Sequence, residues 1–155
     1  MIQRIQTVYL LLVAGLFIAL MFLPLADVRS GDMVFSFDIA GLNTLTEPSV
    51  LTSSTWPLIV LVAIMALLSL VAVFMYKKRI LQIRICVFNS LLTIGFCILF
   101  GLYLWRFAKS PDLPDFKVSM QVWAAFPIIS LILNYLAIRK IGSDEALVRS
   151  LDRLR

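Results

Sequence analysis

The chain has no histidine and few charged residues. Only 15% of its 155 residues are charged, whereas soluble domains carry about 25%. Histidine is the commonest haem and metal ligand and the commonest proton shuttle, so the chain lacks the residue that such sites most often use. The sequence therefore predicts neither a cofactor nor a metal site.

Other chemical groups are missing from the places where membrane enzymes and transporters use them. The long apolar runs have no carboxylate in their central parts, which argues against a proton relay or a cation antiporter. The two cysteines, Cys86 and Cys97, share one apolar run, so a thiol-oxidising enzyme is not indicated. A phosphate-binding glycine loop is also absent from the sequence. We find no catalytic constellation and expect a protein that is not an enzyme.

Apolar residues are present in excess. They make up 61% of the chain, against about 45–50% in soluble domains, and one small core cannot bury them all. Four runs are long enough to cross about 30 Å of hydrocarbon as helices. The predicted fold class is an all-α membrane protein, a four-transmembrane-helix bundle forming a single domain over residues 1–155. The predicted spans are residues 8–25, 56–76, 83–105 and 118–138.

Basic residues are distributed unequally between the connecting segments. Residues 1–7, 77–84 and 139–155 together carry ten of the 14 lysines and arginines. The positive-inside rule therefore places both termini in the cytoplasm, which agrees with an even number of spans. Topology also explains the net charge of +5 better than nucleic-acid binding does.

The segment 26–55 is predicted to be the largest outer loop. Ser30-Gly31-Asp32 is a turn signal, so Leu25–Arg29 and Met33–Asp38 are expected to pair as a small β-hairpin. Such a hairpin is marginal alone and needs support from the helix ends or the membrane surface. The polar segment 43–55 is expected to be irregular.

A stripe of small or polar side chains follows the third predicted span. Asn89, Thr93, Cys97 and Gly101 succeed each other at intervals of four residues. In lipid, small and polar residues favour close helix packing, so the stripe predicts a helix–helix seam. The alternative is the lining of a polar cavity. Asn134 lies at the matching depth of the fourth span, so we expect both amides to face the interior, within reach of each other or of one shared water.

Pro127 lies inside the predicted fourth span. Proline lacks an N–H group, so it is expected to leave the carbonyl of Trp123 unpaired and to bend the helix. The bend is interpreted as shape fitting, with a hinge of a moving transporter as the alternative.

The cytoplasmic tail is predicted to form a separate short helix over residues 143–155. Gly142 can end the preceding span and Ser143 can cap the new helix. The helix is amphipathic, and either it lies on the inner membrane surface or it docks a cytoplasmic partner. Its candidate contact residues are Leu147, Arg149, Leu151, Arg153 and Leu154.

The two ends of the chain, MIQRIQTVYL and DEALVRSLDRLR, resemble a bacterial family of small four-span inner-membrane proteins. The family is catalogued as domain of unknown function 4293. The resemblance covers the whole chain in layout and implies a multi-pass protein of the bacterial inner membrane. It implies no activity, and it transfers no functional residue.

Two functions fit these features. The first is an accessory or scaffold protein that binds other membrane or cytoplasmic proteins through its tail helix or outer loop. The second is a small transporter or channel for an uncharged or lipid-like substrate. The absence of catalytic groups favours the first. The expected partners are the lipid bilayer and another protein, with no nucleic acid, and the sequence leaves a homo-oligomer open.

Overall fold

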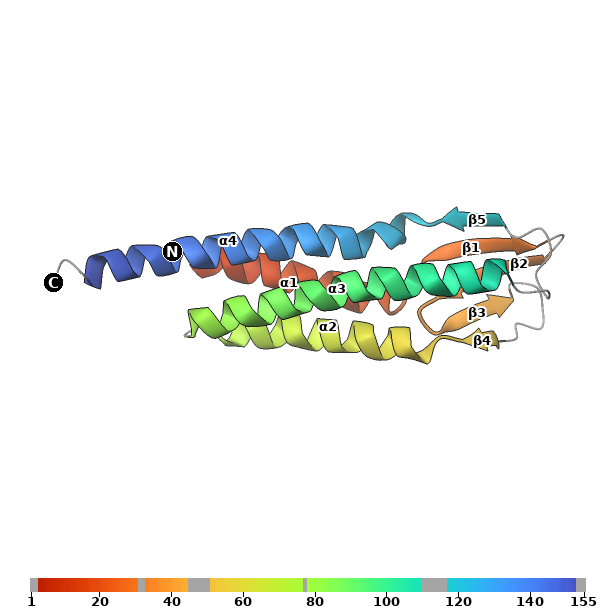
Figure 1. The fold of residues 1–155 in the computed structure, drawn as a ribbon, viewed down its shortest axis with the longest axis horizontal. Helices are drawn as coiled ribbons and strands as arrows, with labels where there is room; N and C mark the ends of the chain where they lie inside the picture. The colour runs from red at the N-terminus through yellow and green to blue at the C-terminus, as the bar shows by residue number, and fades with distance from the viewer. Residues whose placement is uncertain (1–2, 31–32, 45–50, 77, 110–116, 153–155) are drawn as a thin grey trace.

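The computed structural model describes residues 3–30, 33–44, 51–76, 78–109 and 117–152 (Figure 1). These residues form four α-helices, five β-strands and one short 3₁₀ helix, so the prediction of a mostly helical chain with four helices is confirmed. The elements are α1 (Gln3–Leu20), β1 (Ala26–Ser30), β2 (Met33–Asp38), β3 (Gly41–Thr44), β4 (Leu51–Ser54), α2 (Trp56–Phe74), α3 (Arg79–Ala108), β5 (Lys117–Met120), η1 (Val122–Ala125) and α4 (Phe126–Asp152).

The four helices pack lengthwise with the sheet at one end (Figure 1). Helix α1 contacts α2 and α4, and α3 contacts the same two helices from the other side. Helices α1 and α3 run toward the sheet, whereas α2 and α4 run away from it, so neighbours are antiparallel. We call this part of the molecule the helical region, with a sheet end and an opposite, open end.

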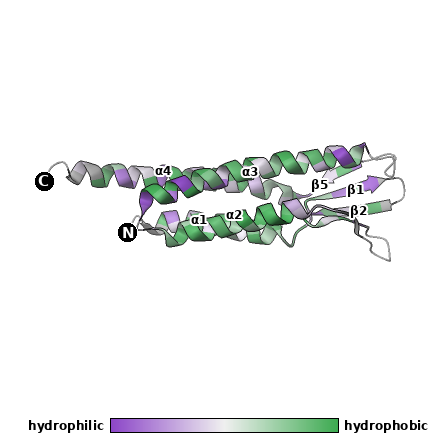
Figure 2. Cartoon of the chain, turned by 60° about the horizontal axis from the view of Figure 1, so that its bottom comes forward, coloured by the Kyte–Doolittle hydropathy of each residue, from purple (hydrophilic) through white to green (hydrophobic). Residues whose placement is uncertain are grey.

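The helices of the helical region consist mostly of apolar residues (Figure 2), and many of their large apolar side chains are exposed. Leu67 and Leu91, for example, are each 61% exposed. A helix that is apolar all round suits a lipid environment. Three helices are long and apolar enough to cross a membrane, namely Trp56–Phe74, Arg79–Ala108 and Val122–Val148, while the apolar part of α1, Ile5–Leu20, is shorter. These properties indicate a membrane protein.

The predicted hairpin exists, but it is the centre of a larger sheet. Strands β1 and β2 pair antiparallel, with Ala26 opposite Phe37, as the turn signal indicated. The full order is β4-β3-β2-β1-β5, and every neighbouring pair is antiparallel.

One loop prediction and the start of one predicted span were wrong. The polar segment 43–55 was expected to be irregular, but its described residues contribute to β3 and β4. Gly41 allows the chain to turn from β2 back into β3, because its φ of 152° lies in a region that other residues rarely adopt. Thr55 then fixes the end of β4, since its hydroxyl donates to the carbonyl of Ile39 at 2.8 Å. The start of the predicted fourth span, residues 118–120, belongs to β5, which pairs with β1.

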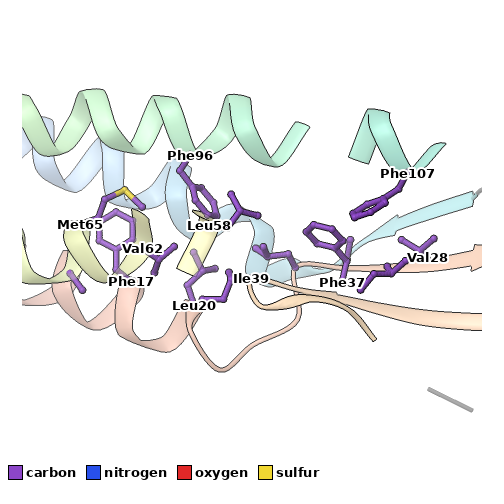
Figure 3. Packing of buried hydrophobic residues seen from close by; sticks show 14 of the residues in the cluster. Phe17, Leu20, Val28, Phe37, Ile39, Leu58, Val62, Met65, Phe96 and Phe107 are labelled. Carbon is purple, nitrogen blue, oxygen red and sulfur yellow. The ribbon is translucent and has the colours of Figure 1, made fainter. Parts of the chain in front are cut away.

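One apolar core joins the sheet to the helices (Figure 3). The ring of Phe37 on β2 meets Phe100 and Phe107 of α3 edge-on, with centroid distances of 5.4 and 5.6 Å. Helix α3 has 30 residues, about 45 Å of helix, so its last turns reach beyond the predicted span and cover the sheet. The sheet is therefore supported by helix ends, as the marginal stability of a lone hairpin requires.

The boundaries of the helices also differ from prediction. The first span was expected over residues 8–25, but α1 begins at Gln3 and ends at Leu20. Leu25 already belongs to the sheet end, where its N–H donates to the carbonyl of Phe37 at 2.8 Å. The tail was expected to break at Gly142, but α4 continues through Gly142 to Asp152.

Candidate functional site: a buried polar layer and the open end of the helices

A layer of buried polar side chains crosses the helical region near its middle. All of its members are at most 2% exposed, although apolar residues surround them. Helix α2 supplies one residue, and α3 and α4 supply two each. The members are Ser69, Asn89, Thr93, Ser130 and Asn134.

Asn89 links α3 to α2. Its side-chain amide donates to the hydroxyl of Ser69 at 2.8 Å, and that hydroxyl donates to the carbonyl of Met65 at 2.9 Å. Thr93 donates to the carbonyl of Asn89 at 2.8 Å, one turn back along α3. These bonds satisfy donors that would be costly to bury alone.

Asn134 links α4 to α3. Its amide donates to the carbonyl of Cys86 and to the hydroxyl of Ser90, both at 3.0 Å. Asn134 therefore faces the interior, as the sequence predicted. The two amides do not share a bond, because Asn89 points to α2 while Asn134 engages α3.

Three atoms of this layer have no hydrogen-bond partner among the described residues. They are the side-chain oxygens of Asn89 and Asn134, both acceptors, and the hydroxyl of Ser130. Buried polar atoms in proteins are normally paired, with protein or with ordered water. Two carbonyl oxygens and one hydroxyl of the layer therefore keep unused hydrogen-bonding capacity, and its five side chains are all uncharged.

The predicted stripe on α3 turns away from the interior toward the C-terminal end of the helix. Asn89 and Thr93 are buried and Cys97 is half-buried, but Gly101 is exposed, and a methyl group added to it would meet nothing within 4 Å. Four residues turn a helix by about 400°, so each step of the stripe rotates it about 40° further. Placing Gly101 in a seam within this chain was therefore wrong.

Pro127 does not bend α4. It is the second residue of that helix and follows the 3₁₀ helix η1, so it stands where a helix tolerates proline. The carbonyl of Trp123, predicted to be unpaired, accepts the N–H of Phe126. Pro127 therefore helps to begin α4, and the predicted kink was wrong.

Polar contacts fasten α4 to its neighbours at the open end. The side chain of Gln6 on α1 donates to the carboxylate of Asp144. Arg79, at the start of α3, donates to the carbonyl of Asp144 at 3.3 Å and lies 4.0 Å from the carboxylate of Glu145. Gln82 donates to the carbonyl of Ala72 at 2.9 Å, closing the turn between α2 and α3.

The tail residues continue the line of α4 instead of starting a new helix. Ser143 was predicted to cap that helix, but its hydroxyl donates to the carbonyl of Arg139 at 3.0 Å, one turn back. Leu147 is 57% exposed. The side chains of Arg149 and Leu151, together with Arg153 and Leu154, lie outside the described residues.

The outward face of the sheet is polar. Asp38 accepts hydrogen bonds from Ser36 at 2.8 Å and from Asn43 at 3.0 Å. Gln121, just after β5, donates to Asp27 on β1 at 2.6 Å. In the described part of the chain, no three histidine, cysteine or acidic residues stand close enough to hold a metal ion.

Sequence reasoning missed Ser69 and Ser130, which complete the polar layer. A signal was available, because Ser69 is the one hydroxyl in the otherwise apolar run of α2. The partners of Asn89 and Asn134 could therefore have been sought among span hydroxyls instead of between the two amides.

Comparison with known proteins gives a family but no activity. None of the curated proteins matches the chain. The protein-family model described as Domain of unknown function (DUF4293) matches residues 2–154, almost the full length. The chain therefore belongs to the DUF4293 family, which the resemblance of its two ends had indicated.

Proposed function

We propose that the chain is a four-span integral protein of a bacterial inner membrane, with both termini in the cytoplasm, and that it serves as a non-enzymatic accessory or scaffold component for other proteins. The proposal treats α1 as a span because α1 packs along α2 and α4 as their full neighbour. Its 18 residues give about 27 Å of helix, close to the thickness of the hydrocarbon core.

Aromatic residues support the membrane placement. Trp56 and Trp123 stand at the sheet end of α2 and beside the start of α4, and both are exposed, at 66% and 36%. Tyr76 follows α2 at the open end, about 30 Å of helix from Trp56. Aromatic side chains at this spacing are typical of the two membrane interfaces. The basic residues near the open end then fall in the cytoplasm.

One observation carries the scaffold function: α4 continues unbroken past the ends of the other helices (Figure 1). Its direction favours projection into the cytoplasm over a position in the plane of the membrane surface. Leu147 and Val148 are 57% and 40% exposed on this projection. Exposed apolar residues on a helix in water favour burial against another helix or groove. This supports the docking alternative for the tail.

A second candidate, transport of a small uncharged substrate, is favoured by the unpaired oxygens of Asn89, Ser130 and Asn134. A conduit would have to continue from this layer to the sheet end. There, the fully buried side chains of Phe17 and Met65 pack with Phe96, which is 1% exposed (Figure 3). This closed apolar layer makes the scaffold function the better supported proposal.

The decisive experiment places a photo-crosslinking amino acid at Leu147 in cells that produce the chain at its native level. A docking helix predicts one discrete adduct after irradiation, which mass spectrometry then identifies. The matched control places the same amino acid at Val87, which is 45% exposed on the lipid-facing side of α3 and should yield no discrete protein adduct.

Two variants at neighbouring positions test whether the adduct depends on the apolar face of this helix. Replacing Val148 with serine should weaken the adduct formed from position 147, whereas Ala146→Ser should leave it unchanged. An adduct absent at position 147, or equal in both variants, would refute docking through this face. Gentle detergent extraction should also recover the same protein with the chain, and recovery of the chain alone would count against a stable complex.

A further inference from the structure

A groove at the open end, between α1 and α4, has the composition of an anion site. It encloses about 360 Å³ and is lined by Tyr9, Leu136, Arg139, Lys140 and Ser143. Two of these residues are cationic and none is acidic. We propose that this groove binds the phosphate headgroup of an anionic phospholipid, an inference that rests on the proposed membrane orientation.

The donors of the groove are available. Within the described part of the chain neither Arg139 nor Lys140 has a carboxylate partner, and the Tyr9 side chain has no hydrogen-bond partner there. Ser143 already donates its hydroxyl hydrogen to Arg139, so the donors that remain are the guanidinium, the ammonium and the phenol. A phosphate accepts several charge-assisted bonds of this kind at once.

A second groove at the same end provides a contrast. It encloses about 500 Å³ and contains Lys78 and Arg79, but Glu145 lines it as well. The carboxylate of Glu145 lies 4.0 Å from Arg79, which also donates to the carbonyl of Asp144. Its cationic charge is thus partly neutralised, so the first groove has the stronger attraction for an anion.

The position of the first groove favours a lipid over a free phosphate ion. Arg139 follows directly after the apolar part of α4, at the level where headgroups begin. Leu12 comes about one turn after Tyr9 on α1 and Ile132 about one turn before Leu136 on α4, both toward the membrane centre, and they are 51% and 56% exposed. An acyl chain can lie along these residues while its phosphate meets the cations, as in basic pockets between spans on the cytoplasmic side.

The test is native mass spectrometry of the full chain released from nanodiscs that contain equal amounts of phosphatidylglycerol and phosphatidylcholine. The wild-type chain should retain phosphatidylglycerol preferentially. The Arg139→Gln/Lys140→Gln variant should lose that preference by roughly tenfold, because each cation near a headgroup contributes measurably to binding. The matched control is Lys78→Gln/Arg84→Gln, which removes two charges at the same end and should keep the preference.

Equal retention of the two lipids by the wild type, or equal loss in both variants, would overturn the proposal. Displacement of the retained lipid by millimolar inorganic phosphate, with no effect of the acyl chains, would assign the groove to a soluble anion instead. Circular dichroism of each variant confirms folding, and Tyr9→Phe gives a milder test with little risk to the fold. Failure here leaves the Leu147 adduct unaffected, so the two proposals fail separately.

Discussion

At the scale of single residues, few polar side chains are buried in the helical region, and most of them are hydrogen-bonded. Asn134 and Asn89 each join two helices, but through hydroxyl or carbonyl partners and not through each other. Hydrogen bonds of this kind in membranes average about 0.6 kcal/mol, so they fix the register of the helices more than they add stability. We expect the packed aromatics at the junction of helix and sheet to contribute more, because burying an aromatic side chain is worth more than one such bond.

Asn134→Ala should lower the free energy of unfolding by about 1 kcal/mol, because it removes both hydrogen bonds that Asn134 donates to α3, to the carbonyl of Cys86 and the hydroxyl of Ser90. Denaturant titration in detergent micelles measures the change. Tyr135→Phe is the control, since Tyr135 is the next residue of α4 and is 62% exposed. Identical midpoints for the two variants would contradict the assigned role.

Phe37→Ala should cost about 3–5 kcal/mol, the usual range for a fully buried aromatic residue. It removes the ring that both Phe100 and Phe107 contact. The same titration checks this, with Phe22→Ala, at a side chain that is 82% exposed, as the control. A loss no greater than that of the control would mean that the sheet is not anchored through this ring.

At the scale of elements, apolar runs predicted the helices well, and the turn signal at residues 30–32 predicted the hairpin. The wrong predictions concern segments whose structure depends on contacts with distant parts of the chain. Strand β5 has four residues and gains its stability only by pairing with β1, so local sequence hardly distinguishes it from the start of a span. Gly142 can end a helix, yet α4 continues because Gln6 and Arg79 hold the next turn at Asp144.

For the candidate site, the sequence predicted Asn89, Thr93 and Asn134 correctly as interior residues but not their partners. Which hydroxyl meets an amide depends on the relative rotation of two helices, and a single helix pattern does not define that rotation. The grooves at the open end were likewise not predictable, since each is formed by residues of two or more helices.

The pairing of β5 with β1 can be tested by cross-linking. Asp27→Cys with Ser119→Cys places thiols at directly opposite positions, so oxidation should form a disulfide when Cys86 and Cys97 are replaced by alanine. The control pair, Arg29→Cys with Ser119→Cys, is shifted by two residues and should remain mostly reduced. Gel mobility after proteolysis between the two sites measures both, and equal oxidation of the pairs would refute the register.

At the scale of the whole molecule, the sheet end and the open end have opposite characters. One end carries a polar sheet fixed to the helices by a shared core, and the other carries cationic grooves and the projecting end of α4. The arrangement agrees with the proposed topology, in which the two ends lie on opposite sides of the membrane.

The proposed topology predicts the labelling of single cysteines by a membrane-impermeant maleimide in cysteine-free chains. Arg29→Cys should react in intact spheroplasts. Gln3→Cys and Ala146→Cys should react only after the membrane is permeabilised. Reaction of Gln3→Cys from outside, with Ala146→Cys still protected, would show that α1 does not cross, leaving the three spans of α2, α3 and α4.

The order of the sheet has a consequence for biogenesis. Strand β1 follows α1, but the strand that covers its edge is made about ninety residues later, after α3. Until β5 has been made, β1 is the edge strand of the sheet on this side, and an unpaired β edge is a known hazard for aberrant association. The sheet thus reaches its full strand order only after three of the four helices have been made.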